Sequence, residues 1–269
     1  MISFIKNATK SFLRQKGYSL LCRRTQAPPY VAYDQDGLFS VHNCEFMLDP
    51  PFIAAYERGM KAARGADFTW HWRVHVGLWA AKCAVRLKGD FVECGVGSGF
   101  LSSAIMKYLD WNSTGKHFHL LDTFEGIDLR YTTEAERKGR DIETQNRLNR
   151  LHGVYASDFE SVEKNFSEWS NVHLVKGPIP ESLPQCKAGA VAYLHLDMNC
   201  SPPETAALDF FWDKLVPGAF ILLDDYAYAG LREQKLGMDR CAAEKGVSVL
   251  ALPTGQGLIV APADKTGAG

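Results

Sequence analysis

The sequence lacks every cysteine pattern that builds a disulfide or zinc framework. Its seven cysteines, at positions 22, 44, 83, 94, 186, 200 and 241, are odd in number and never form a C-x-x-C pair. Structural zinc sites need closely spaced ligands, and disulfides are rare in reducing compartments. We therefore expect neither framework, and we expect the protein to be cytoplasmic.

Long apolar runs and an excess of one charge are also missing. No stretch approaches the roughly 20 apolar residues of a membrane span. The beginning, MISFIKNATKSFLRQKGYSLL, carries bases throughout instead of the apolar centre of a secretory signal. Lys and Arg total 30 and Asp and Glu 31, but residues 1–26 hold six bases and no acid. The remaining body, with 24 bases and 31 acids, is a poor candidate for binding nucleic acid.

Short apolar stretches alternate with longer amphipathic ones from about residue 89 onward. This alternation predicts an α/β fold, a mostly parallel sheet with helices on both faces. The last two stretches are separated by only four residues, which favours an antiparallel hairpin. Methyltransferases that use S-adenosylmethionine (SAM) commonly end in this way, whereas nicotinamide-binding folds do not. The seven expected strands are residues 90–94, 117–122, 172–176, 191–197, 219–225, 247–252 and 257–262.

Helices are expected before the sheet, over residues 50–64 and 71–87. In the second, Val74, Leu78, Ala81 and Val85 recur at helical spacing and should pack on the sheet. Residues 124–157 form a charged insertion that we interpret as a partly helical lid, because long loops in compact domains are often covers. A solvated decoration is the alternative.

The stretch FVECGVGSGF, residues 91–100, joins an apolar strand to a helix through a glycine-rich turn. Such a turn presents backbone N–H groups and a positive helix end to a ligand. Phe100 stands where a dinucleotide motif needs Gly or Ala, and Glu93 would repel a pyrophosphate but could accept from an ammonium group. Asp122, which ends the next strand, could hold two ribose hydroxyls. These features favour SAM, the alternative being a tight turn with a structural Glu93.

Three acids follow the ends of two later strands. Asp197 ends one of them, and Asp224 and Asp225 end the next. Because neighbouring strands lie about 4.8 Å apart, these carboxylates should converge in the crevice where such folds bind ligands. Oxygen ligands without cysteine favour Mg²⁺ or Ca²⁺ over zinc. The alternative is a set of solvated strand ends.

Taken in order, GDFVECGVGSGFLSSAIM, LLDTFEG, LVKGPIPESLP, LHLDMN and LVPGAFILLDDY resemble the macrocin O-methyltransferase family over roughly residues 68–262. The resemblance implies a Rossmann-like class I methyltransferase fold, SAM as the methyl donor and Mg²⁺ dependence. It also implies a sugar hydroxyl as acceptor, in glycan, polysaccharide or glycosylated natural-product biosynthesis.

The resemblance also assigns individual residues. Asp122 corresponds to the ribose acid, and the three aspartates Asp197, Asp224 and Asp225 to the metal ligands. Arg73 could reach the SAM carboxylate, or else form a salt bridge on its helix. The SAM-binding turn corresponds to Glu93, Gly95, Gly97 and Ser98. The adenine edge corresponds to Gly177, Pro178 and Ile179.

One residue departs from the family pattern. Many members carry a second Asp, taken as the general base, two residues after the first metal ligand, where this chain has Asn199. An amide can orient a hydroxyl but cannot accept its proton. The alternatives for the base are Asp197, His75, Lys235 or water, with His195 also on the Asp197 face of its strand. We favour Asp197 acting together with the metal.

Residues 1–67 are interpreted as a basic amphipathic segment with a helical extension, and 68–264 as the SAM-dependent methyltransferase domain. Residues 1–24 could lie on an anionic membrane surface at the inner face of the membrane, or pack on the protein itself or on a subunit partner. We expect a homo-oligomer. Two rival functions remain: an NAD(P)-dependent sugar oxidoreductase or epimerase, and a non-catalytic protein that binds SAM or glycan.

Overall fold

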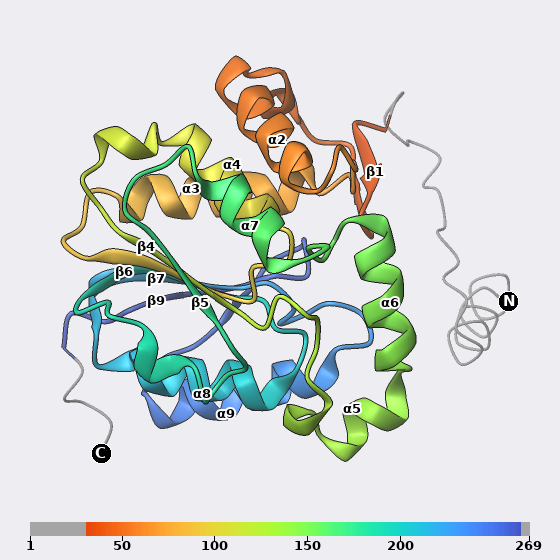
Figure 1. Cartoon of the computed structure of the whole chain (residues 1–269), viewed down its shortest axis with the longest axis vertical. Coiled ribbons are helices and arrows are strands. Elements are labelled where there is room, and N and C mark those ends of the chain that lie inside the picture. The colour runs from red at the N-terminus through yellow and green to blue at the C-terminus, as the bar shows by residue number, and fades with distance from the viewer. Residues whose placement is uncertain (1–30, 265–269) are drawn as a thin grey trace, which may run out of the picture. The chain divides into compact units, whose positions relative to one another are not determined.

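The computed structural model describes residues 31–264 (Figure 1). The strands are β1 (Tyr33–Gln35), β2 (Leu38–Ser40), β3 (Asp90–Cys94), β4 (Phe118–Asp122), β5 (Val172–Lys176), β6 (Val191–Leu196), β7 (Leu215–Leu223), β8 (Leu250–Ala251) and β9 (Gly257–Val260). The α-helices are α2 (Pro50–Ala62), α3 (His71–Ala84), α4 (Phe100–Tyr108), α5 (Glu134–Gly139), α6 (Ile142–His152), α7 (Phe159–Phe166), α8 (Ser201–Trp212) and α9 (Arg232–Glu244). Short 3-10 helices are η1 (Glu45–Leu48), η2 (Trp111–Ser113), η3 (Leu129–Tyr131) and η4 (Leu183–Gln185).

Seven strands form one mixed sheet in the order β5-β4-β3-β6-β7-β9-β8. The five strands from β5 to β7 are parallel, and β9 pairs antiparallel with both β7 and β8. This arrangement confirms the predicted α/β fold and its terminal hairpin. The strand order reverses between β3 and β6, and open α/β sheets bind their ligands at such a point.

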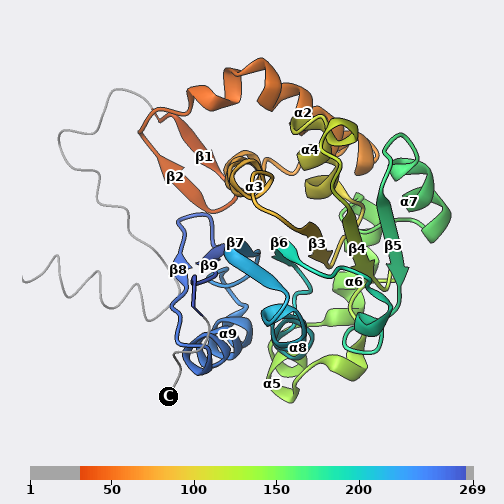
Figure 2. The same ribbon diagram turned by 90° about the vertical axis from the view of Figure 1, so that its left-hand side faces the viewer.

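Helices cover both faces of the sheet, as Figure 2 shows. Buried side chains from α2, α3, α4 and α7 pack with one face, and those from α8 and α9 with the other. Because β6 is covered on both sides, all six of its residues are buried. The predicted packing of α3 is confirmed for Val74, Leu78 and Ala81, whereas Val85 is only partly buried.

The eighth strand is shorter than predicted. We expected a strand over 247–252, but β8 contains only Leu250 and Ala251. The backbone N–H of Val247 donates to the carbonyl of Ala242 at the end of α9, 3.0 Å away. The amide of Val247 is therefore bonded to the end of α9 and is not available to a neighbouring strand. Strand β8 begins three residues later, at Leu250.

The insertion 124–157 contains η3, α5 and α6, in keeping with its predicted partly helical character. A reciprocal capping box joins Thr133 and Glu136 at the start of α5, and Asp141 caps α6. Within residues 31–264, no helix has the length and apolar character that a bilayer span requires. The basic segment 1–24 lies outside the described residues.

Candidate active site

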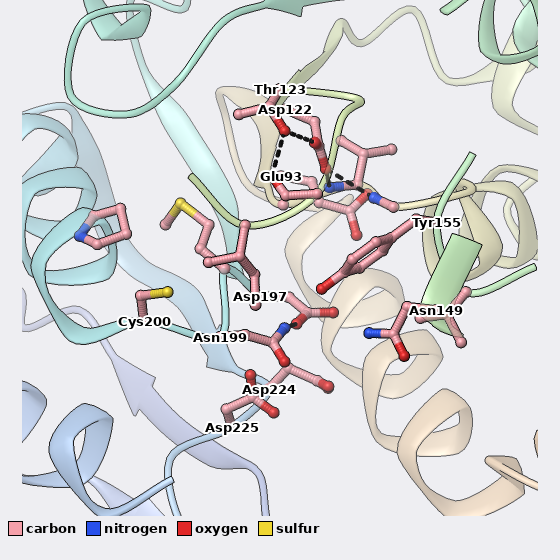
Figure 3. Close-up of a pocket in the computed structure, with 18 of the residues that line it drawn as sticks. Glu93, Asp122, Thr123, Asn149, Tyr155, Asp197, Asn199, Cys200, Asp224 and Asp225 are labelled. Atoms are coloured by element: carbon pink, nitrogen blue, oxygen red, sulfur yellow. Dashed lines mark hydrogen bonds between the residues drawn. The ribbon is translucent and has the colours of Figure 1, made fainter. Parts of the chain in front are cut away.

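A cavity of about 510 Å³ opens at the carboxyl ends of the parallel strands. The turns after β3, β4, β6 and β7 line it, together with the insertion that carries α5 and α6. It brings together the glycine turn, Asp122, the segment 177–179 and the three clustered aspartates. Figure 3 shows Asp122 and the aspartates in this cavity. Residues far apart in the sequence thus meet in one space because the parallel strands all end there.

The glycine turn is bent so tightly that side chains would not fit. Gly95, Gly97 and Gly99 have φ angles of 90°, 57° and 86°, a region that L-residues avoid. A Cβ on Gly95 would lie only 1.9 Å from the carbonyl oxygen of Asp197. The glycines therefore let β3 turn against the end of β6 and aim the amino-terminal end of α4 at the cavity.

Asp122 holds this turn in place. Its Oδ2 accepts from the N–H groups of Val96 and Gly97 at 2.6 and 2.8 Å, and its Oδ1 accepts from that of Phe124 at 2.6 Å. Burial raises the pKa of this carboxyl, although these hydrogen bonds oppose the shift. Besides the ligand role expected from the sequence, Asp122 thus organises the backbone of two turns.

Glu93 lies behind the turn and pairs with a buried histidine. Its Oε1 is 2.8 Å from Nδ1 of His195, and its Oε2 is buried and has no hydrogen-bond partner. Burial lowers the pKa of His195, but the Asp224 carboxylate, 3.8 Å from Nε2, and the hydrogen bond to Glu93 outweigh it and raise the pKa to about 10. His195 is therefore a buried link between the two parts of the site.

The three aspartates gather as a group, each offering a carboxylate oxygen within 4.8 Å of the others. Burial raises the pKa of Asp225 to about 7, with the Asp224 charge as the next cause. Burial, followed by the charges of Asp224 and Asp225, also raises the pKa of Asp197 well above its usual value. The carboxylates repel one another, so a bound cation would stabilise the cluster.

Asp224 differs because a buried arginine from α3 pairs with it. Arg73 donates through Nη1 to Asp224 Oδ2 and through Nε to Asp36 Oδ2 at 2.8 Å. Gln256 donates to Asp224 Oδ1 at 2.8 Å. Burial would raise the pKa of Asp224, but Arg73, His195 and Gln256 lower it. The sequence left two roles for Arg73, binding the SAM carboxylate or forming a salt bridge on the surface of its helix. The structure contains a salt bridge to Asp224, but it is buried and lies within the site.

Asn199 follows Asp197 in a left-handed conformation with a φ of 58°, which asparagine tolerates better than most residues. Its Nδ2 donates to Asp197 Oδ1 at 3.1 Å. Its backbone carbonyl accepts from Arg140, which follows α5 in the insertion. Asn199 therefore orients Asp197, and the insertion is fastened to the same turn.

Two residues considered as bases lie elsewhere. The ring of His75 stacks on Phe46 with centroids 4.0 Å apart and does not line the cavity, because its side of α3 faces an aromatic cluster. Lys235 pairs with Asp239, one turn along α9, and is partly exposed. The expectation that either reaches the acids is wrong for this structure.

Sequence reasoning missed two groups. Glu204 on α8 is 1% exposed, and burial followed by the charges of Asp225 and Asp197 raises its pKa well above its usual value. Tyr155 lines the cavity on the side of the insertion, and its hydroxyl points toward Asp197 (Figure 3). An acid in the first turn of the helix after LHLDMN was the available signal for Glu204, whereas nothing local marked Tyr155.

Unpaired polar atoms indicate which ligands the cavity fits. Asp225 Oδ2, Glu93 Oε2 and Ser98 Oγ are buried without a partner. Buried polar atoms are normally hydrogen-bonded, so these positions call for ligand donors. A cation suits Asp225, and an ammonium group suits Glu93. The donor set therefore fits a divalent metal beside an amino-acid-bearing cofactor.

The chain is similar to several known proteins. The family model described as macrocin-O-methyltransferase matches residues 80–241. A curated relative from Streptomyces olivaceus, 8-demethyl-8-(2,3-dimethoxy-alpha-L-rhamnosyl)-tetracenomycin-C 4'-O-methyltransferase, is 29% identical over 152 residues. That match spans 54% of this chain and only 56% of the relative's length.

Solved structures show the same fold. The O-methyltransferase NovP superposes with a TM-score of 0.58 at 20% identity, covering 71% of this chain and 79% of that one. The calicheamicin methyltransferase CalS11 gives a TM-score of 0.54 at 15% identity, covering 82% of this chain and 94% of that one.

Proposed function

Because this chain belongs to the macrocin-O-methyltransferase family, we propose that it transfers the methyl group of SAM to a sugar hydroxyl with the help of Mg²⁺. One observation carries this proposal. The glycine turn and the aspartates at the ends of β6 and β7 line the same cavity, so a methyl donor and a metal-held hydroxyl would be neighbours. Proximity and alignment of the reacting groups are large terms in catalysis.

The chain's own residues divide into a donor side and an acceptor side. On the donor side, Glu93 Oε2 suits the SAM ammonium group, and the turn at Gly97 and Ser98 offers a close backbone approach. Asp122 would border the ribose and Gly177 to Ile179 the adenine, since all of them line the same cavity. Arg73, which also lines the cavity and is a candidate for the SAM carboxylate, balances the charge of Asp224.

On the acceptor side, Asp197, Asp224 and Asp225 would hold Mg²⁺, which lowers the pKa of a hydroxyl bound to it. Asp197 accepts from Asn199 through Oδ1, so Oδ2 is left to take the hydroxyl proton. We therefore assign the proton transfer to Asp197 and the orientation of Asp197 to Asn199.

The relatives indicate the kind of acceptor. The Streptomyces enzyme acts, by its name, on a rhamnosyl group of a tetracenomycin, and CalS11 is named for calicheamicin. We infer a sugar of a glycosylated natural product or glycan as acceptor. The insertion 124–157 would act as its lid, since Arg140 donates to Asn199 in the turn after β6 and Glu136 accepts from the N–H of Ser201 at the start of α8.

The proposal is tested with the purified chain, SAM, Mg²⁺ and a panel of rhamnosides and nucleotide sugars. Mass spectrometry should detect addition of one methyl group, and a chelator should abolish it. Asp197→Asn should lower kcat by about 100-fold or more, the scale of a lost general base. SAM affinity measured by calorimetry should stay within about threefold, whereas the exposed Asp213→Asn control should change neither quantity.

The rival functions give different results. Turnover that survives chelation would contradict the role of the metal. Binding of NAD in preference to SAM would favour the oxidoreductase, and SAM binding without transfer to any acceptor would favour the non-catalytic protein.

A further inference from the structure

A smaller pocket of about 150 Å³ adjoins the active-site cavity. The two share Gly139 and Arg140 from the end of α5, and Gly230 and Leu231 just before α9. Its volume exceeds what a single water molecule requires. The active-site space therefore continues past the aspartates, between the insertion and the start of α9.

One side chain in this pocket has no internal partner. Gln234, on the first turn of α9, is 1% exposed, and both its Oε1 and its Nε2 are buried without a hydrogen bond. An amide offers two donors and two lone pairs, and leaving all of them unpaired in the interior costs free energy. The Gln234 amide is therefore well suited to a ligand that both donates and accepts hydrogen bonds.

Arg140 supplies a second open group at the boundary between the two pockets. Its Nη2 donates to the carbonyl of Asn199, while its Nη1 is buried and unpaired. The same guanidinium therefore contacts the turn that carries Asp197 and holds an unpaired donor where the two pockets meet. A ligand bound at Nη1 would be positioned relative to the reacting hydroxyl.

The charges around the pocket decide the chemistry of its occupant. Arg140 and Arg232 contribute two positive charges, and Glu136 and Glu233 two negative ones. The lining as a whole is therefore not basic, and it does not favour a phosphate. Neutral hydroxyl groups, which donate and accept at once, match Gln234 and the Arg140 donor better.

We propose that this pocket is a second acceptor subsite that binds a neutral sugar unit next to the sugar being methylated, with Gln234 and Arg140 as its hydrogen-bonding residues. The inference rests on the proposed function. It implies that the natural acceptor is a glycoside of at least two units, since a lone monosaccharide at the aspartates would leave Gln234 unpaired.

The test compares methyl α-L-rhamnoside with the methyl glycoside of a rhamnosyl-glucose disaccharide, using wild type and Gln234→Met. Methionine keeps the unbranched shape of glutamine without its amide. Wild type should show a KM about tenfold lower for the disaccharide, and Gln234→Met should lose this preference with kcat for the rhamnoside unchanged.

The exposed Gln185→Met serves as the control and should keep the preference. An unchanged KM ratio in Gln234→Met would overturn the inference. A third acceptor, dTDP-rhamnose, is assayed with both proteins. If Gln234→Met raises the KM only for dTDP-rhamnose, the pocket binds a nucleotide instead of a second sugar, and the inference is overturned. If wild type transfers no methyl group to any probe, the proposed function fails instead. Calorimetric binding of the disaccharide to wild type and Gln234→Met would then still decide the subsite.

Discussion

At Gly95 the backbone of the glycine turn passes against the carbonyl of Asp197, and this approach sets the spacing between the donor and acceptor sides. Neighbouring carboxylates then acquire different properties through their individual contacts. Arg73 and Gln256 keep Asp224 charged, whereas Asp225 has an unpaired oxygen and a raised pKa. Single hydrogen bonds, more than the residue types, separate the roles of these acids.

Gly95→Ala should be strongly destabilising. The new Cβ would lie 1.9 Å from a backbone oxygen that cannot swing aside, and the φ of 90° is itself unfavourable for alanine by about 1–2 kcal/mol. We expect a loss of more than about 2 kcal/mol in the free energy of unfolding, measured by urea denaturation. Gly189→Ala, where the Cβ would meet nothing within 4 Å, should be nearly neutral. Equal stability of the two variants would show that the turn can relax.

Among the elements, β3, β4, β5 and β6 were predicted most accurately, because each is a short apolar run bounded by polar residues. These four match their predicted ranges to within one residue, whereas β7 begins at Leu215, four residues before the predicted 219–225, and ends at Leu223. The predicted start of β8 was wrong because the N–H of Val247 hydrogen-bonds to the end of α9 instead of to a strand. The insertion illustrates the same limit, since its helices could be expected from charge and length but its attachment to the turn after β6 could not.

The β4–β5 pair carries a titratable cluster away from the cavity. His119 is buried beside His173, with Asp90, His117 and Lys214 as the other charged or titratable neighbours. Burial, followed by the positive charge of His173, lowers the pKa of His119 to about 4.

As pH falls from about 6.5 to 4, unfolded chains take up a proton at His119 and folded ones do not. This group therefore lowers stability across that window, by about 3 kcal/mol at most. Chemical denaturation between pH 7 and pH 4 should show a smaller loss of stability in His119→Gln than in wild type. The exposed His152→Gln should retain the wild-type loss, and an identical slope in all three proteins would contradict the prediction.

For the whole molecule, the buried acids predict a dependence of stability on divalent cations. Mg²⁺ at 100 times its Kd should add about 2.7 kcal/mol, seen as a rise in melting temperature. Asp225→Asn should abolish that rise and should melt no lower than wild type without metal, because it removes a charge that Asp224 and Asp197 repel. The exposed Asp213→Asn should respond to Mg²⁺ like wild type. A rise that persists in Asp225→Asn would place the cation elsewhere.

The sequence by itself determined the order of strands and helices, the glycine turn and the ends of the strands that carry the acids. These features follow from local periodicity and from the rule that parallel strands end on one side of a sheet. Only the tertiary structure decided the partner of each acid. Arg73 on α3 and Gln256 in the β8–β9 turn meet Asp224 although they are far from it in the chain, and Gln234 is left unpaired beside Arg140. Such pairings depend on how helices pack against the sheet, and no local pattern encodes the distance between side chains on different elements.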